Sequence, residues 1–360
     1  MTDRACDGCI TRSWLLGRLA GHLERARGRI DQVLELGDDD LITAIGGREA
    51  SDLRRELEAL NLDQMRSRAG AVGLDAVCGC DPAYPPRLRA LGAPPAVLYV
   101  AGGLERLTGI LADDPVALVG SRKASPYGLD VARALGRGLA ASGLTVVSGM
   151  ALGIDSAAHA GALEAGRPTV AVLPTSADRP YPRGKRALHR RIVAGGAAVS
   201  ELGPGTDVWR WMFPARNRII AALAAMTVVV EAGERSGALV TARLARGIGR
   251  PVGAVPGRVT QPQTAGSNGL LAAGACVVRG PQDVLDHLFG AGERTASAEP
   301  RAEPSAELVP LLKAIAAGHD TVAALTRAGF GPDTGLAALA ALELGGFVRR
   351  GVGGRFRVAP

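Results

Sequence analysis

The sequence has no long apolar run, few aromatic residues and few cysteines, and each scarcity narrows the classes of protein to consider. A membrane-spanning helix needs about 20 consecutive apolar residues, and no stretch of the 360 residues approaches that length. The first residues, MTDRACDGCITRSWLL, mix acidic with basic side chains and lack the apolar segment of a signal peptide. We therefore expect a cytoplasmic protein with no membrane partner.

The five cysteines are Cys6, Cys9, Cys78, Cys80 and Cys276. Their odd number argues against a disulfide framework and favours reduced thiols. Cys6-x-x-Cys9 and Cys78-x-Cys80 could together supply four thiolates to zinc. The second spacing is tighter than that of the usual zinc knuckle, so zinc binding is the less favoured alternative. We predict no metal site and no cofactor.

Lysine is scarce too, because Lys123, Lys185 and Lys313 are the only lysines among 42 basic residues. The formal net charge of +7 attracts polyanions, and arginine suits bidentate contacts with phosphate. Many basic proteins bind no nucleic acid, however. Charge alone therefore favours a nucleic-acid partner only weakly.

The order of the expected elements predicts an α/β protein. Apolar residues at helical spacing indicate a helical domain over 1–75, and the prolines within 76–112 predict an extended connection. Over 113–289, short β-branched runs alternate with helical stretches, which is typical of a doubly wound, mostly parallel sheet. The expected strands are 116–119, 144–147, 169–173, 197–200, 226–230, 251–255 and 275–278, and the helices between them include 128–141, 155–164 and 216–225.

The last part of the chain predicts a separate small domain. Residues 290–305 are rich in Ala, Glu, Pro and Ser, a composition typical of a linker. Helical segments follow over 306–317, 321–328 and 333–344, and two short β-runs flank Gly353-Gly354. Three helices and a hairpin match the outline of a winged-helix-like domain over 306–360.

Ligands of a doubly wound sheet bind where strands end and loops lead into helices, and these loops are polar here. The first two carry hydroxyls, charges and glycines that suit an anion and a close backbone approach. The third interleaves a tyrosine with basic residues, as expected for a surface that stacks bases and neutralises phosphates. The candidate DNA-binding residues of all the loops are Ser121, Arg122, Lys123, Ser125, Gly149, Gly153, Asp155, Tyr181, Arg183, Lys185, Arg216, Asn217, Arg218, Ser236 and Gly237.

Arg216 and Arg218 give the best purely physical indication of an anion site. They are expected at the start of an apolar helix, where the helix dipole disfavours cations and a bound anion would remove the cost. A neighbouring carboxylate, Glu201 or Glu231, could neutralise them instead. In the same way, Arg122 could be an ion-pair partner of Asp155.

A series of motifs occurs in a fixed order across residues 120–257. They are G-S-R-x-x-S-x-Y-G, S-G-x-A-x-G-I-D-x-x-A-H, D-x-x-Y-P, S-E, F-P-x-R-N-R-I-I, E-A-x-x-x-S-G-x-L-x-T-A and V-P-G. This series resembles the DNA-processing protein A (DprA/Smf) family. The resemblance implies an extended Rossmann-like fold, a homodimer, and single-stranded DNA bound near Ser121, Arg122, Gly149 and Arg183. It also implies a role in competence, natural transformation and DNA recombination, with protection of incoming DNA and loading of the RecA recombinase onto it.

Two other functions compete with single-stranded DNA binding. A Rossmann-like nucleotide or nucleoside-phosphate hydrolase would need a nucleophile–base pair or a carboxylate dyad, and no convincing spacing for either is present. A regulator of double-stranded DNA would read bases with the helix at 333–344, yet that segment, DTGLAALAALEL, has no basic residue. We therefore predict a single-stranded DNA-binding protein that is not an enzyme.

Overall fold

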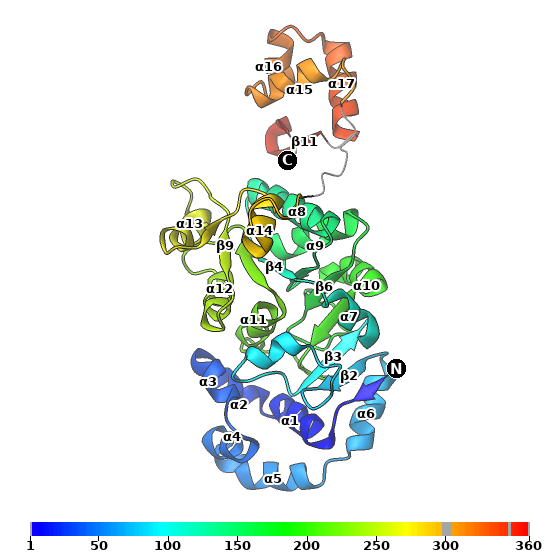
Figure 1. Cartoon of the computed structure of the whole chain (residues 1–360), viewed down its shortest axis with the longest axis vertical. Coiled ribbons are helices and arrows are strands. Elements are labelled where there is room, and N and C mark those ends of the chain that lie inside the picture. The colour runs from blue at the N-terminus through cyan, green and yellow to red at the C-terminus, as the bar shows by residue number, and fades with distance from the viewer. Residues whose placement is uncertain (1, 297–303, 345–346, 359–360) are drawn as a thin grey trace. The chain divides into compact units, whose positions relative to one another are not determined.

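The computed structural model describes residues 2–296, 304–344 and 347–358. Contacts divide the chain into two compact units, Met1–Ser297 and Ala298–Pro360. Figure 1 shows the elements of both units along the chain. No helix among the described ranges is long and apolar enough to cross a membrane.

The first unit is built on a mixed sheet of ten strands in the order β1-β2-β3-β7-β6-β5-β4-β8-β9-β10. From β7 to β10 all neighbouring strands are parallel, as the alternating β-branched runs predicted. Their order along the sheet reverses between β4 and β8, so the loops after these two strands diverge. The bounds of the parallel strands are β4 Val116–Val119, β5 Val146–Ser148, β6 Thr169–Val172, β7 Ala197–Ser200, β8 Met226–Val229, β9 Val252–Ala254 and β10 Cys276–Val277.

The stretch expected as an extended connection adds strands to this sheet. The antiparallel strands β2 (Asp75–Cys78) and β3 (Val97–Ala101) pair with each other, and β3 pairs with β7. The short strand β1 (Asp3–Arg4) pairs parallel with β2. The prolines between β2 and β3 allow a short 3₁₀ helix at Pro86–Ala90, and the helix α7 (Leu104–Ile110) follows β3. Strands β2 and β3 therefore extend the sheet beyond β7, and β1 forms its outer strand on that side.

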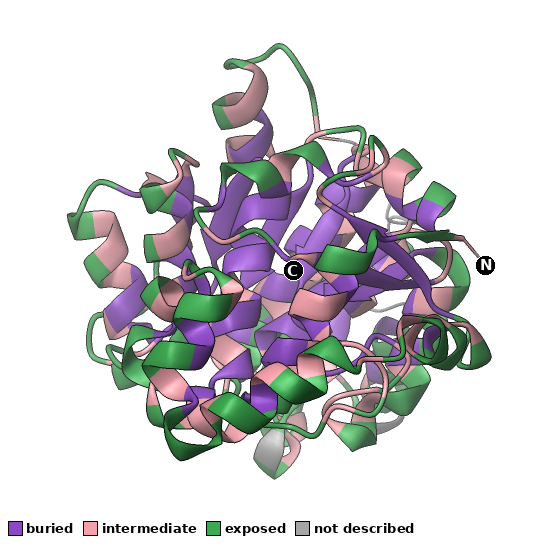
Figure 2. Cartoon of the chain, turned by 90° about the horizontal axis from the view of Figure 1, so that it is seen from below, coloured by how far each residue is buried: buried purple, intermediate pink, exposed green. Residues whose placement is uncertain are grey.

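Helices cover both faces of the parallel strands because successive side chains of a strand point to opposite faces. Val116 and Leu118 pack with helices α8 (Pro126–Ala141) and α9 (Ile154–Glu164). Ala117 and Val119 pack on the opposite side with α11 and α12. Figure 2 shows the buried strands between these partly exposed helices. The remaining helices of this part are α10 Arg186–Gly195, α11 Met212–Leu223, α12 Gly237–Gly247, α13 Ala265–Ala272 and α14 Pro281–Phe289.

The N-terminal helices form their own apolar cluster, which extends into the sheet domain. Leu15, Leu19 and Leu41 pack against Trp211 and Met212, which lie at the start of α11. Residues 7–71 are mostly helical, as apolar spacing predicted. The helices are α1 Asp7–Arg18, α2 Ala20–Arg25, α3 Ile30–Leu34, α4 Asp38–Ile45, α5 Ala50–Glu58 and α6 Leu62–Ala71.

The described residues of the second unit form three helices followed by an antiparallel pair of strands. The helices are α15 Val309–Ala316, α16 Val322–Arg327 and α17 Pro332–Leu344, and the antiparallel strands are β11 Val348–Arg350 and β12 Phe356–Val358. Leu311, Leu325, Leu342 and Phe356 form its core. Of the expected linker 290–305, residues 297–303 lie outside the described residues.

Candidate functional site

A cleft lies at the carboxyl ends of the parallel strands, where the loops after β4 and β8 diverge. Its volume is about 630 Å³, and loops from several strands contribute to its wall. This is the position at which open α/β sheets bind their ligands. Eight of the predicted residues line the cleft: Ser121, Arg122, Lys123, Asp155, Arg216, Asn217, Ser236 and Gly237.

Helix N-termini are part of this cleft, and their free N–H groups favour an anion. Helix α12 begins at Gly237, directly after the lining residue Ser236. The Ser236 hydroxyl accepts a hydrogen bond from the backbone N–H of Ala238 at 3.3 Å. Asn217 donates from Nδ2 to the carbonyl oxygen of Gly237 at 3.4 Å, which ties α11 to the start of α12.

The exposed charged residues that line the cleft are positive. Arg122, Lys123 and Arg235 are exposed, line the cleft, and have no ion-pair partner among the residues that the structure describes. Asp155 is the one acidic lining residue, and among the described residues it makes no ion pair with Arg122, although the positive charge of Arg122 favours its ionised form. Whether Arg122 serves the fold or a ligand therefore stays a prediction. These cations are free to neutralise a bound anion.

Aromatic side chains connect the third loop to the cleft. The guanidinium carbon of Arg122 lies 4.9 Å from the ring centre of Phe213, at a distance typical of a cation–π contact. The Phe213 ring in turn packs edge-on against Tyr181, with ring centres 5.4 Å apart. Arg183 and Lys185 follow Tyr181 in a short 3₁₀ helix, outside the residues that line the cleft. The structure therefore places a basic loop beside the cleft, with half-buried aromatic rings between the two.

Arg216 and Asp155 lie at the floor of the cleft and are both buried. Burial lowers the pKa of the Arg216 guanidinium to about 10, an effect that the nearby Asp155 opposes. Burial likewise raises the pKa of Asp155, against the positive charge of Arg216. The Nη1 atom of Arg216 donates to the carbonyl oxygens of Gly149 at 2.6 Å and Val172 at 2.7 Å. Arg216 thus holds the loops after β5 and β6 together.

Arg218 is part of the core rather than of the cleft. It is 3% exposed, and its Nη2 donates to Oε1 of Glu201 at 2.6 Å. The expectation of a DNA contact at Arg218 assumed that the helix starts near Arg216. Helix α11 begins at Met212, so both arginines lie beyond its first turn, where the dipole argument no longer applies. The alternative that Glu201 neutralises an arginine is correct for Arg218.

Three other predicted residues support the loops. The Ser125 hydroxyl accepts from the Gly128 N–H as the N-cap of α8 and donates to Glu231. A Cβ on Gly149 would lie 2.1 Å from the Nη1 atom of Arg216. Gly153 has a φ of +79°, and a Cβ there would lie 2.2 Å from the Ser121 carbonyl oxygen. The two glycines therefore permit the close packing of the loops that form the cleft.

Sequence reasoning missed Arg235, Phe213 and Gln263. Arg235 and Gln263 line the cleft, and Phe213 contacts both Arg122 and Tyr181. Arg235 had a detectable signal, because it directly precedes Ser236-Gly237 in a loop already identified. Gln263 gave no such signal, because it lies outside the motif series over residues 120–257.

Known proteins resemble the region that forms this site. The family model of DNA recombination-mediator protein A matches residues 75–289. A DNA processing protein DprA of Mycobacterium tuberculosis is 46% identical over 228 residues, 63% of this chain. The chain spans little more than half the length of that protein, 57%. The DNA processing protein DprA of Bacillus subtilis is 31% identical over 242 residues, which cover 67% of this chain and 80% of that protein.

Solved structures resemble the fold as well. DNA processing protein A from Streptococcus pneumoniae matches with a TM-score of 0.64 and 32% identity over 78% of this chain and 96% of that one. A structure describing the single-stranded DNA binding mode of DNA processing protein A from Helicobacter pylori matches with a TM-score of 0.52 and 32% identity. It covers 57% of this chain and 92% of that one. Because the family model covers more than half of the chain, this protein belongs to the DNA recombination-mediator protein A family.

Proposed function

We propose that this protein binds single-stranded DNA in the cleft at the carboxyl ends of β4, β5 and β8. The observation that carries the proposal is a group of exposed cations at the cleft, Arg122, Lys123 and Arg235, which make no ion pair among the described residues. Arg122 also lies over the Phe213 ring, which packs against Tyr181. A single strand presents both phosphates and unstacked bases. Proteins that bind it combine a positive groove with aromatic side chains on which the bases stack.

Each part of the cleft has a role in this proposal. The N-termini of α9 and α12 and the exposed arginines neutralise phosphates, while Asn217 and Ser236 offer neutral polar contacts. Arg183 and Lys185 extend the positive surface beyond Tyr181. Arg216 and Asp155 keep the loop backbones in place from beneath and do not need to touch the strand.

Titration with matched single-stranded and double-stranded oligonucleotides tests the proposal. We expect tighter binding of the single strand and a steep loss of affinity with salt, because phosphate neutralisation releases counterions. Fluorescence anisotropy at several salt concentrations measures both. Equal affinity for the duplex at every salt concentration would contradict a single-strand cleft and favour the second unit as the reader of DNA.

The cleft supports binding rather than catalysis. Its lining residues include no histidine and no cysteine, and its one carboxylate, Asp155, is buried near Arg216. His159 lies close by in α9, but burial lowers its pKa to about 3, and its Nδ1 is 2.8 Å from the Thr169 hydroxyl. It is therefore poorly suited to act as a general base. A nucleotide-hydrolysis assay run beside the titration tests the alternative hydrolase, for which we expect no turnover.

The wider role follows from the family resemblance. We propose that the protein acts as a cytoplasmic homodimer that protects incoming DNA in natural transformation and loads RecA onto it. The sheet domain, with its extended Rossmann-like topology, would hold the strand in this scheme. The second unit is proposed as a winged-helix-like module whose helix α17 serves a protein contact, since its sequence contains no basic residue.

A further inference from the structure

Four cysteines from two separate parts of the sequence meet where β1 pairs with β2. All four precede the first loop of the cleft in the sequence. The Sγ atoms of Cys6, Cys9, Cys78 and Cys80 all lie within 4.8 Å of one another. The parallel pairing of β1 with β2 brings the segments together, with Asp3 opposite Ala76 and Arg4 opposite Val77. Cys6 lies two residues after the end of β1, and Cys78 is the last residue of β2.

The tight Cys78-x-Cys80 spacing is compatible with one shared site because the chain turns there. The backbone N–H of Asp81 donates to the carbonyl oxygen of Cys78 at 3.0 Å, which closes a turn over residues 78–81. As a result the Cys80 Sγ lies 3.8 Å from the Cys6 Sγ. The short Cys78-x-Cys80 spacing, which argued against a metal site in the sequence, therefore still allows both thiols to reach the same site.

The sulfur separations fit a single tetrahedral ion. Zinc binds thiolates at about 2.3 Å, so two ligands of a tetrahedral site lie about 3.8 Å apart. A disulfide needs sulfurs about 2.05 Å apart. In an iron–sulfur cluster some of the four thiolates bind different iron atoms, which holds those sulfurs further apart than the 4.8 Å within which all four lie here. The 3.8 Å between the Cys6 and Cys80 sulfurs matches two ligands on one tetrahedral ion.

The surroundings of Cys6 suit negatively charged sulfur. Cys6 is the N-cap of α1, where the helix dipole and free N–H groups stabilise a thiolate. The Cys6 N–H also donates to the Cys78 Sγ at 3.4 Å, the kind of hydrogen bond that orients a metal ligand. Cys78 is buried, whereas Cys6 and Cys80 are exposed, so an ion can enter from solvent.

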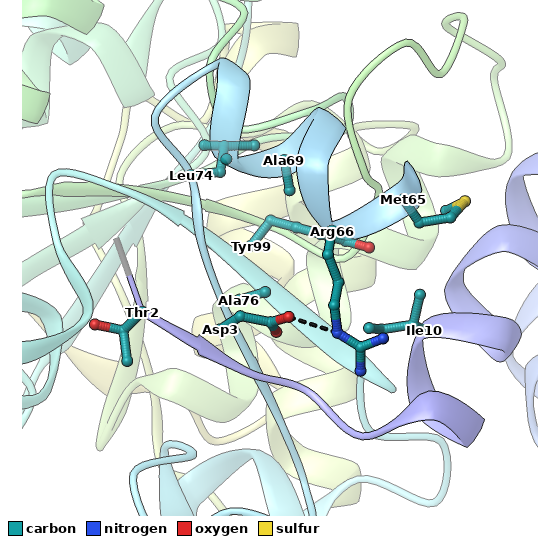
Figure 3. Close-up of a pocket in the computed structure, with 10 residues that line it drawn as sticks. Thr2, Asp3, Ile10, Met65, Arg66, Ala69, Leu74, Ala76 and Tyr99 are labelled. Carbon is teal, nitrogen blue, oxygen red and sulfur yellow. Dashed lines mark ion pairs between the residues drawn. The ribbon is translucent and has the colours of Figure 1, made fainter. Parts of the chain in front are cut away.

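Arg66 of α6 fixes the segment that carries Cys6. Its guanidinium donates to the Ala5 carbonyl oxygen at 2.9 Å and pairs with Asp3 at 2.7 Å and Asp7 at 2.8 Å. Figure 3 shows Arg66 reaching from its helix to Asp3 on β1, beside a small cavity. Residues on both sides of Cys6 are thus held in place without any help from the sulfurs.

We propose that Cys6, Cys9, Cys78 and Cys80 bind one Zn²⁺ as a four-thiolate structural site. Four protein ligands close the coordination sphere, which is the arrangement of structural rather than catalytic zinc. The ion would fasten the start of α1 to the end of β2 and so attach the N-terminal helices to the sheet. Thiolate ligands also select zinc over hard cations such as Mg²⁺ or Ca²⁺.

Metal analysis of the full-length protein purified from zinc-supplemented cells tests this inference. We expect one zinc per chain in the unmodified protein, and loss of that zinc in Cys9→Ser and Cys80→Ser. Cys276→Ser is the matched control, because the Cys276 thiol lies beside His287 and outside the cluster. This variant should keep its zinc.

Two further readouts keep the test independent of whether a variant folds. Cobalt added to the chelated wild-type protein should give the visible bands of a tetrahedral thiolate complex, and a zinc chelator should lower the Tm of the wild type. Zinc-free wild-type protein with a disulfide among these four cysteines would overturn the proposal. So would iron in place of zinc, or full zinc content in Cys80→Ser.

Discussion

Replacing Arg218 by alanine should destabilise the first unit by about 3–5 kcal/mol, because it leaves the Glu201 carboxylate buried without its partner. The two side chains are 4% and 7% exposed, and the Nη2–Oε1 distance of 2.6 Å is that of a strong charged hydrogen bond. A domain of this size is stable by about 5–15 kcal/mol, so the variant should lose a large part of its stability. Thermal unfolding should show a Tm lower by roughly 10 °C.

The matched control for this change is Arg183→Ala. Arg183 is exposed and has no ion-pair partner among the described residues, so its loss should leave the Tm almost unchanged. The double variant Glu201→Gln/Arg218→Met should be more stable than Arg218→Ala, because it removes the unpaired charge and restores apolar volume. An unchanged Tm in Arg218→Ala would show that the ion pair does not hold α11 against the end of β7.

Replacing Arg122 by alanine should weaken single-stranded DNA binding about tenfold without lowering the Tm. The expected loss corresponds to about 1.4 kcal/mol, as for one charged contact with a phosphate. Arg122 is exposed, lines the cleft and makes no ion pair among the described residues, and its guanidinium lies over the Phe213 ring, so we expect the fold not to depend on its side chain. The salt dependence of binding should also become shallower by about 0.7 in log–log slope, the value for one phosphate of a single strand.

The matched control for Arg122→Ala is Arg167→Ala, which removes one positive charge at the amino ends of the parallel strands, away from the cleft. Arg167 is exposed and precedes β6, at the amino ends of the parallel strands, so its loss should not change the affinity. Combining Arg122→Ala with Arg183→Ala should give additive losses if the two arginines contact separate phosphates. A lower Tm with unchanged affinity in Arg122→Ala would instead make Arg122 a structural residue.

The parallel strands could be predicted because burial on both faces leaves continuous β-branched runs, as in Val116–Val119 and Met226–Val229. The strands β1, β2 and β3 could not be predicted from the sequence. Strand β1 contains only two exposed residues, and β2 and β3 lie in a stretch where prolines suggested irregular structure. Strand pairing between residues 3–4 and 76–77 is a long-range contact that no local pattern encodes.

The site residues that the sequence identified are likewise those whose positions follow from local patterns. The residues Ser121, Arg122, Lys123 and Ser236 lie in the loops that lead from β4 and β8 into the next helices, so the topology alone places them at the cleft. Arg218 resembled them in type and context. Its position depends on where α11 begins, and Pro214 lies inside the first turn of that helix, where proline is tolerated. The prediction that this helix starts at residue 216, after Pro214, was therefore wrong.

Photo-cross-linking of the full chain to a single-stranded oligonucleotide carrying 5-bromodeoxyuridine tests the cleft most directly, because peptide mapping shows which residues lie against the bases. We predict cross-links in the peptides that contain Phe213 and Tyr181, which decrease when unlabelled single strand competes and decrease less with duplex. Cross-links confined to residues 304–358, with none in the loops after β4, β6 and β8, would contradict the account.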